Sequence, residues 1–515
     1  MSNGIVNEFY TLPGEIRSFD LPGAGTLKFL IILCCLLFCL LIRRSIYLIY
    51  GNFVVTIPHP ISADEIRSRF SCEMSDMYRD EVPKYGALLD IVSKVNTGVL
   101  DRNPALHKAL DSANELARLD VERHGAIRLG KPEELHTMRR IFYVMGMHPV
   151  GYYDLSVAGV PVHATAFRPI TDEALNRNPF RVFTSLLRLE LIEDEALREK
   201  AAAILERRQI FSDRVLHLLD KYESEGGLSG QDAHIFVSEV KEIFRWHQDA
   251  TVSQEIYKQL HDSHRLIADV VCFKGPHINH LTPRTLDIDE VQEQMGQLGL
   301  NPKEVIEGPP RRQCPILLRQ TSFKALEEKI RFADDEQAGT HTARFGEIEQ
   351  RGVALTAKGR ALYDQLLDQA RSYNNEGNAG DGYARRLAES FKAFPDDVET
   401  LRKEQLAYFR YVLNDAALFN AKAGSDGVRD LDVLISTGAV AVEPIVYEDF
   451  LPVSAAGIFQ SNLGGAEQKH YAANASRLQF EKDLGIAVLD ELMLYEAAQA
   501  KSIEVLFSTL ETVVA

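Results

Sequence analysis

Three short segments that lie far apart in the chain carry the side chains that most restrict how it can fold. They are VERHGAIRLG at 121–130, GPHINHLTPRTLDID at 275–289 and RFGEIEQRG at 344–352. Two histidines and one glutamate are the ligand set from which proteins build a facial Fe(II) site that keeps positions open for substrate and oxygen. We therefore expect the fold to bring these segments to one metal, and metal-dependent oxygen chemistry is the first hypothesis.

Length and composition are those of a globular protein. The chain has 515 residues, of which 45% are hydrophobic and 25% charged, enough for two to four ordinary domains or one large two-lobed unit. Its net charge of -17 argues against a nucleic-acid partner, because phosphate binding needs a concentrated basic surface. A carboxylate substrate would have to be held by individual arginines or lysines, so arginines near the site are candidates.

The cysteines exclude a disulfide framework and a zinc knuckle, because three lie together in an apolar run and the others are scattered. The first group is Cys34, Cys35 and Cys39, and the second is Cys72, Cys272 and Cys314. We therefore expect a reducing, cytosolic setting for the folded part, which also suits a ferrous centre.

An uninterrupted apolar run covers residues 29–42, with Lys28 before it and Arg43 and Arg44 after it. A bilayer span needs about 20 residues, so the predicted membrane helix extends over about 29–50. The paired arginines place its C-terminal side, and hence the catalytic domain, in the cytoplasm. Two alternatives stay open: an extension outside the functional protein, and a helix buried against a partner.

The body of the protein is predicted to begin at Ile61, because Ser62 and Glu65 form a capping box that opens a helix. This predicts an N-terminal extension over 1–60, a catalytic domain over 61–500 and a C-terminal tail over 501–515.

Apolar periodicity predicts helices from there to about 120 and again over 185–270. Strand-like pieces occur at 271–273, 314–323 and 341–350, and a Gly/Asn-rich surface loop at 373–383. The mixture indicates an α+β fold in which sheet carries the metal site and helices are inserted around it.

His124 and Arg128 are four residues apart, a spacing that keeps both side chains on one face of a helix or strand. A metal ligand and a guanidinium would then point into one cavity. That arrangement suits a 2-oxo acid, which chelates a metal through its carboxylate and keto oxygens while an arginine neutralises the carboxylate. The alternative is an exposed histidine beside a surface ion pair with Glu122.

His277 and His280 are three residues apart, so on a strand they face opposite sides and only one should be a ligand. The other is expected to pack or to support the site. Asp287 and Asp289 follow with alternating spacing, and either orient the histidines or are solvated.

Four side chains of the segment 341–350 share one face of a predicted strand: His341, Phe345, Glu347 and Glu349. A buried face that carries carboxylates is unfavourable unless a metal or a cation neutralises them, so the strand supports a nearby cation site. An exposed edge strand explains the charges equally well. Strand parity does not separate Glu347 from Glu349 as the ligand.

Long motifs over about 61–495 resemble the 2-oxoadipate dioxygenase/decarboxylase family, a divergent branch of the vicinal oxygen chelate superfamily. The motifs are ERHGAIR, YYDLSVAGVPVHATAFRPI, NPFRVFTSLLRLELI, HRLIADVVCF, HINHLTPRTLDID, EGPPRRQCPILLRQTSFKALEE, HTARFGEIEQRG and YEDFLPVSAAGIFQSNLG. The resemblance implies a cupped β-sheet around a metal, with large helical insertions. It also implies an Fe(II) enzyme that converts 2-oxoadipate and O2 to 2-hydroxyglutarate and CO2 in lysine catabolism.

Carried over residue by residue, the resemblance implies that His124, His280 and Glu347 bind iron. The two histidines would also contact the substrate, and Arg128 would be the catalytic residue that grips it. FGEIEQR is similar to the F-x-E-x-x-Q-R segment of 4-hydroxyphenylpyruvate dioxygenase relatives, which aligns Glu347 with their iron-binding glutamate. Val453 and Ser454 resemble the part of the family that contacts the distal carboxylate.

Two other functions remain open. One is a glyoxalase-type isomerase or lyase, in which a divalent metal acts on a 2-oxo acid as a Lewis acid without oxygen uptake. The other is a non-catalytic, membrane-tethered carboxylate-binding protein without metal. Oxygen consumption separates the first from a dioxygenase, and metal analysis separates the second.

Overall fold

The computed structural model describes residues 47–50, 53–56, 60–323, 325–372, 381–425, 427–451 and 473–513. The chain divides into two compact units, Met1–His59 and Pro60–Ala515. The described part of the first unit is an antiparallel hairpin of β1 (Tyr47–Tyr50) and β2 (Phe53–Thr56).

The membrane helix predicted over 29–50 falls mainly on residues 29–46, outside the described residues. At its C-terminal end the prediction is wrong, because Tyr47–Tyr50 form β1. Aromatic and β-branched residues favour strands, and the Gly-Asn pair between YLIY and FVVT is typical of a hairpin connection. Among the helices in the described ranges, none combines the length and the apolar character needed to cross a bilayer.

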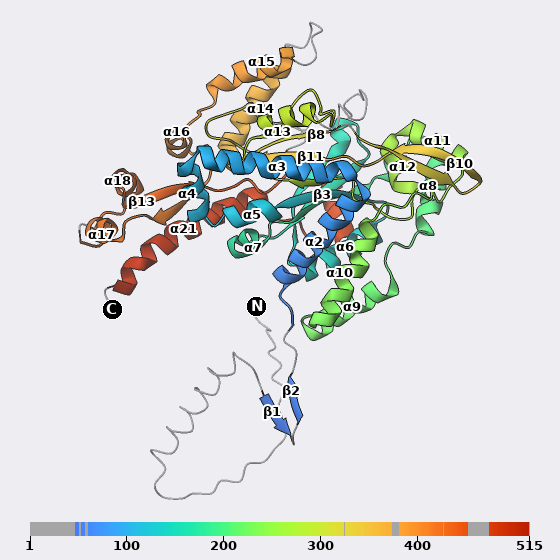
Figure 1. The fold of residues 1–515 in the computed structure, drawn as a ribbon, viewed down its shortest axis with the longest axis horizontal. Helices are drawn as coiled ribbons and strands as arrows, with labels where there is room; N and C mark the ends of the chain where they lie inside the picture. The colour runs from blue at the N-terminus through green and yellow to red at the C-terminus, as the bar shows by residue number, and fades with distance from the viewer. Residues whose placement is uncertain are drawn as a thin grey trace, which may run out of the picture. The chain divides into compact units, whose positions relative to one another are not determined.

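The second unit contains both helices and strands, which confirms the predicted α+β class (Figure 1). Its helices are α2 (Ala63–Glu81), α3 (Pro83–Arg102), α4 (Pro104–Ser112), α5 (Leu116–Val121), α6 (Pro132–Val144), α7 (Asp172–Arg177), α8 (Glu195–Glu206), α9 (Asp213–Glu225), α10 (Gly230–Phe244), α11 (Gln254–Ser263), α12 (Arg265–Val271), α13 (Ile288–Gln297), α14 (Ala357–Ser372), α15 (Asp381–Ser390), α16 (Val398–Lys403), α17 (Ala416–Phe419), α18 (Leu431–Ser436), α20 (Ala473–Leu484) and α21 (Glu491–Val513). Its strands are β3 (Arg123–Leu129), β4 (His148–Asp154), β5 (Val162–Arg168), β6 (Arg181–Leu187), β7 (Leu281–Pro283), β8 (Leu318–Ser322), β9 (Glu327–Phe332), β10 (Asp335–Thr342), β11 (Glu347–Arg351), β12 (Phe409–Leu413) and β13 (Val440–Pro444).

The helical predictions are largely confirmed. Ser62 caps α2 and its hydroxyl accepts a hydrogen bond from the Glu65 amide at 3.2 Å. Helices α2 to α5 fill the first predicted helical region, and α8 to α12 fill the second, after β6 ends at Leu187. Residues 373–380 of the predicted loop lie outside the described residues, and its last three residues, 381–383, are instead the start of α15.

The strand predictions are only partly correct. The piece at 271–273 is not a strand, because the Cys272 amide donates to the Ala268 carbonyl at 3.0 Å and extends the α12 hydrogen-bond pattern. The piece at 314–323 contains β8. The piece at 341–350 is two strands rather than one, since β10 ends at Thr342 and β11 begins at Glu347.

A five-stranded mixed sheet of order β4-β5-β6-β3-β7 forms the centre of this unit. Strand β3 is parallel to β6, and the other pairs are antiparallel. Every residue of β5 and β6 is buried, as expected for a sheet that is covered on both faces.

The two faces of β3 meet different hydrophobic clusters. Ile127 and Leu129 pack in the cluster with α2, α6 and α10, whereas Ala126 packs against the cluster that includes α8, α11 and α12. Side chains alternate between the faces of a strand, so His124 and Arg128 point to the same side as Ala126. Figure 1 shows α8, α11 and α12 at the end of this unit opposite β13, α17 and α18.

Strand β11 lies beside β7. It pairs antiparallel with β8, and Glu349 forms a bridge with Arg284, the residue that follows β7. Because β7 also pairs with β3, three segments that are remote in sequence lie next to one another. This arrangement places the histidines and glutamates of the three segments in one region.

Candidate metal centre

His124 lies on β3 and is buried, with 1% of its surface exposed. The neighbouring Gly125 lets the segment that carries His280 approach β3 closely. A Cβ atom at position 125 would lie 2.5 Å from Ile278 Cδ1 and 2.9 Å from the His280 carbonyl oxygen. Burial of both His124 and Glu122 excludes the alternative of an exposed histidine beside a surface ion pair.

His280 and Glu347 are supplied by two segments that one tyrosine holds together. His280 immediately precedes β7, and Glu347 is the first residue of β11. The Tyr78 hydroxyl of α2 lies 2.7 Å from the Phe345 carbonyl and 3.0 Å from the Asn279 carbonyl. The Phe345 amide also donates to the Asn279 carbonyl at 3.1 Å. These bonds replace a continuous strand over 341–350 and fix the two segments side by side.

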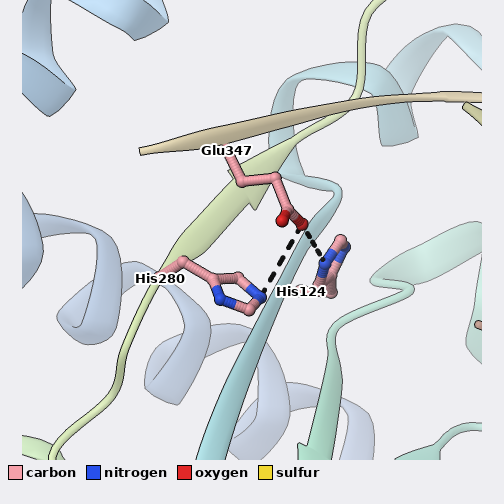
Figure 2. Close-up of side chains that lie close together, drawn as sticks. All are labelled: His124, His280 and Glu347. Carbon is pink, nitrogen blue, oxygen red and sulfur yellow. Dashed lines mark hydrogen bonds and ion pairs between the residues drawn. The ribbon is translucent and has the colours of Figure 1, made fainter. Parts of the chain in front are cut away.

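The three side chains point toward one another from their separate segments (Figure 2). Glu347 Oε1 lies 3.1 Å from His124 Nε2 and 3.8 Å from His280 Nε2. One ligand atom from each residue fits within a 4.8 Å span. Two imidazoles and one carboxylate in this arrangement can hold a divalent metal, and the donor set fits ferrous iron.

The electrostatic environment favours metal binding. Burial lowers the pKa of His280 to about 4, so its imidazole is neutral at pH 7 and offers a lone pair. Burial alone would raise the pKa of Glu347. The charge that His280 carries when protonated, together with the hydrogen bond and the charge of His124, outweighs burial, and the pKa lies below its usual range. Burial also opposes the charged form of His124, yet the carboxylates of Glu349 and Glu347 raise its pKa. A metal would displace that proton.

Glu349 supports the cluster from the other side of His124. Its Oε2 atom lies 3.0 Å from His124 Nδ1, close enough for an ion pair although not aligned as a hydrogen bond. Arg351 donates to both oxygens of Glu349 at 2.8 Å, which holds the carboxylate in place. Thr282 donates to Glu347 Oε1 at 3.2 Å, so each of the two glutamates has a different partner besides His124.

Apolar rings lie against both histidines. The Phe450 ring packs edge-on against His124, with centroids 4.9 Å apart. The Phe345 ring lies 4.9 Å from His280 in a tilted arrangement. These contacts limit rotation of the imidazoles and keep water away from one side of each ring.

Arg128 is on the same face of β3 as His124, as its spacing predicts, but it also has a carboxylate partner that the sequence did not suggest. Its Nη1 atom donates to Asp269 Oδ2 at 2.8 Å. The charge of Arg128 acts on His280, whose pKa it helps to lower after burial and His124. Arg128 therefore shares the face of β3 that carries His124, a member of the candidate metal centre.

Other predicted residues have different positions. Only His280 of the pair joins the cluster, as predicted, whereas His277 lies 3.1 Å from Asp269. His341 is on β10 and contacts Asp269, so the prediction that it shares a strand face with Glu347 is wrong. Asp287 caps α13 and Asp289 pairs with Arg319, so neither orients a histidine.

Val453 and Ser454 lie outside the described residues. Three residues that contact the site or the segments carrying it were not predicted from the sequence: Asp269, Arg351 and Tyr78. Asp269 gave no signal, because nothing in its spacing connects it to Arg128. Arg351 could have been found, because it has the same strand parity as Glu347 and Glu349 and is the cation that a buried carboxylate face requires. Tyr78 could not be distinguished from the other buried residues of its helix, because it fits their apolar spacing.

The sequence matches the family described as 2-oxoadipate dioxygenase/decarboxylase over residues 70–462. The protein of that name from Escherichia coli (strain K12) is 60% identical over 444 residues, which cover 86% of this chain and 98% of that protein. The protein of that name from Pseudomonas putida is 57% identical over 449 residues, covering 86% and 96%.

Solved structures show the same similarity. The hydroxyglutarate synthase from Pseudomonas putida in complex with 2-oxoadipate has a TM-score of 0.82 and 54% sequence identity, and the match covers 88% of this chain and 99% of that chain. A second structure, the crystal structure of the hydroxyglutarate synthase from Pseudomonas putida, has a TM-score of 0.80 and 53% identity. The match again covers 88% of this chain and 99% of that chain.

Proposed function

Because the chain belongs to the 2-oxoadipate dioxygenase/decarboxylase family, we propose that it converts 2-oxoadipate and O2 to 2-hydroxyglutarate and CO2. The reaction balances without another reductant, since both atoms of O2 are retained and the carbon chain loses one carboxyl carbon. The observation that carries the proposal is the cluster of His124, His280 and Glu347, whose ligand atoms lie within 4.8 Å. We assign this reaction to lysine catabolism, as the family resemblance implies.

We propose that His124, His280 and Glu347 hold Fe(II). When bound, the iron supplies chelation of the 2-oxo acid and reductive activation of O2. The protein holds the donors in place: Glu349 orients His124, Thr282 bonds Glu347, and the Phe345 and Phe450 rings restrict the imidazoles. A set of three protein ligands leaves coordination positions for the substrate and oxygen.

Arg128 is proposed to bind the C1 carboxylate and to be the catalytic residue outside the metal ligands. Its position on the His124 face of β3 and its charge near His280 support this role. A guanidinium binds a carboxylate through two parallel N–H donors, which would fix the 2-oxo group relative to the metal. His124 and His280 contact the same end of the substrate.

Further assignments complete the proposal. Val453 and Ser454 contact the distal carboxylate, an assignment that rests on sequence resemblance alone. The five-stranded sheet corresponds to the cupped sheet of the vicinal oxygen chelate superfamily, within a catalytic domain over 61–500. A cytoplasmic setting is supported by the free thiols of Cys72, Cys272 and Cys314.

The test is an oxygen-electrode assay of the Fe(II)-loaded protein with 2-oxoadipate. We expect O2 uptake, CO2 release and 2-hydroxyglutarate formation in equal molar amounts, and no CO2 release under anaerobic conditions. Consumption of the 2-oxo acid without O2 uptake would instead indicate an isomerase or lyase. A His124→Ala variant should lose both iron and turnover, and full turnover by that variant would contradict the proposed metal centre.

A further inference from the structure

A buried polar cluster surrounds the guanidinium of Arg128 on the side formed by α11, α12 and β10. Its centre is Asp269 of α12, whose side chain is only 9% exposed. Asp269 Oδ2 accepts a hydrogen bond from Arg128 Nη1 at 2.8 Å, whereas the Arg128 side chain is 24% exposed. The carboxylate is therefore the more buried partner of this pair.

Two further side chains hold Asp269 in place. His341 Nε2 lies 2.9 Å from Asp269 Oδ1, and the Tyr257 hydroxyl lies 2.9 Å from His341 Nδ1. A neutral imidazole with its proton on Nε2 satisfies both contacts, because it donates to the carboxylate and accepts from the hydroxyl. These contacts thus connect α11 to β3 through Tyr257, His341, Asp269 and Arg128.

Aromatic packing restricts this cluster. The Phe273 ring lies 4.8 Å from the His341 ring, and the Trp246 ring packs edge-on against His277 at 4.6 Å. His277 Nε2 lies 3.1 Å from the same oxygen of Asp269 that His341 contacts. Both imidazoles therefore limit the movement of the carboxylate, and Asp269 is a fixed anchor for a long side chain.

We infer that Asp269 is a positioning residue that fixes Arg128 for the carboxylate of the 2-oxo acid, with His341 and Tyr257 holding Asp269. This inference rests on the proposed role of Arg128 in substrate binding. Asp269 contacts Nη1, and a guanidinium has five N–H donors in a rigid fork, so donors remain for a substrate carboxylate. An unanchored arginine would have to lose its rotamer freedom when the substrate binds, whereas an anchored one has already lost it.

A double-mutant cycle tests whether Asp269 acts through Arg128. The Kd of 2-oxoadipate is measured by anaerobic calorimetry on Fe(II)-loaded protein for wild type, Asp269→Asn, Arg128→Gln and the double variant. We expect Asp269→Asn to raise Kd by about tenfold, within the range of couplings between contacting residues. Arg128→Gln should raise Kd further, and Asp269→Asn should then have no added effect.

Additional measurements separate positioning from a general structural role. Tyr257→Phe removes one bond to His341 and should raise Kd by about two- to fivefold, as expected for one lost hydrogen bond. Asp249→Asn breaks the exposed ion pair with Arg331 and should leave Kd unchanged. In turnover assays Asp269→Asn should raise KM more than it lowers kcat. Iron per chain and the unfolding midpoint are measured for every variant.

The outcomes also distinguish this inference from the proposed function. If Arg128→Gln raises Kd while Asp269→Asn leaves it unchanged, or if the two effects simply add, Asp269 does not act through Arg128 and the inference is overturned. If Arg128→Gln leaves Kd unchanged, the role of Arg128 is wrong and the inference fails with it, while wild-type O2 uptake with 2-oxoadipate would still support the proposed reaction. If Asp269→Asn lost iron to the same extent as it lost affinity for 2-oxoadipate, the inference would also be overturned.

Discussion

The candidate metal centre, formed by His124, His280 and Glu347, and the ion-pair network beside it contain buried carboxylates with different partners. Glu349 belongs to a network of four carboxylates and four guanidinium groups, in which Arg118, Arg181, Arg284 and Arg351 pair with Glu115, Glu122, Glu349 and Glu448. Glu347 is two residues away on the same strand. In the ion pairs of the described residues, Glu347 has only imidazole partners.

The difference shows which carboxylate is suited to an external cation. A buried charge is stable only when it is paired, and the network supplies a permanent arginine charge for each of its carboxylates. The partners of Glu347 are histidines, which are neutral when they bind a metal. A bound metal would therefore compensate the charge of Glu347, whereas Arg351 already compensates that of Glu349.

The largest expected effect is that of Glu347→Gln on metal binding. The amide is a weaker ligand and lacks the negative charge, so we expect iron to be lost and O2 uptake to fall by more than the ~100-fold typical of residues around a metal site. The stability of the metal-free protein should change little, because no arginine loses its partner. Metal analysis, the oxygen electrode and urea unfolding in chelator test this prediction. Retention of iron would contradict the assigned ligand.

For Glu122→Gln, in the ion-pair network, we expect a loss of stability and little change in metal binding. Glu122 pairs with Arg118, Arg181 and Arg284, and removal of its charge leaves several buried guanidinium groups without full compensation. We expect the free energy of unfolding to fall by about 3–5 kcal/mol, as when one partner of a buried ion pair is removed. Urea unfolding of the metal-free protein measures it.

The matched control is Glu65→Gln, which breaks an exposed pair with Arg69 and should change the stability by less than about 0.5 kcal/mol. An equal loss of unfolding free energy in both variants would show that the buried network stabilises the protein no more than an exposed ion pair does. Folded Glu122→Gln should still bind iron, because the proposed ligands His124, His280 and Glu347 keep their own partners.

The contribution of Glu122 to stability should also depend on pH. Burial alone would raise its pKa, but Arg118 and the other network arginines hold the pKa well below the ordinary value of 4.5. A carboxylate with a lowered pKa in the folded state stabilises the protein above the unfolded-state pKa and loses this contribution as the pH falls. The stability difference between wild type and Glu122→Gln should therefore be full above about pH 5 and shrink in acid. A difference that grows in acid would contradict this explanation.

Glu349→Gln tests the boundary between the two regions. Glu349 contacts His124 Nδ1 at 3.0 Å but is not in the metal cluster, so its loss should weaken metal affinity by about 10–100-fold without abolishing binding. A metal-competition titration measures the affinity. If Glu349→Gln lost iron completely while Glu347→Gln retained it, the two glutamates would have the opposite roles.

Sequence patterns predicted the elements that local interactions determine. The capping box at Ser62 and the helical periodicity are confirmed because they depend on contacts within a few residues. The strand predicted at 271–273 was wrong because a short apolar run is compatible with the end of a buried helix as well. The break within 341–350 depends on Tyr78 and Asn279, which are too remote for a local pattern to include.

The same limit applies to the site. Spacing correctly placed His124 and Arg128 on one face. Only one histidine of the later pair joins the site, as expected, although neither lies on the strand that the spacing argument assumed. Parity could not separate Glu347 from Glu349, because the distinction depends on which arginines approach each carboxylate in three dimensions. The family resemblance selected Glu347, and the geometry groups Glu347 with both histidines. Its role as a ligand remains a prediction.

The smallest expected effect is that of Tyr78→Phe, which tests how tightly the two ligand-bearing segments are held. The change removes the hydroxyl that bonds the Phe345 and Asn279 carbonyls but leaves every charge in both regions. We expect a loss of about 1 kcal/mol in unfolding free energy, the usual value for one buried hydrogen bond. Because Asn279 is adjacent to His280 and Phe345 is two residues before Glu347, metal affinity should also fall, but by less than in Glu349→Gln. Tyr85→Phe is the control, since its ring packs against Tyr78 while its hydroxyl bonds neither carbonyl. A loss of metal affinity as large as that of Glu349→Gln would show that segment position, rather than the partner of His124, limits the site.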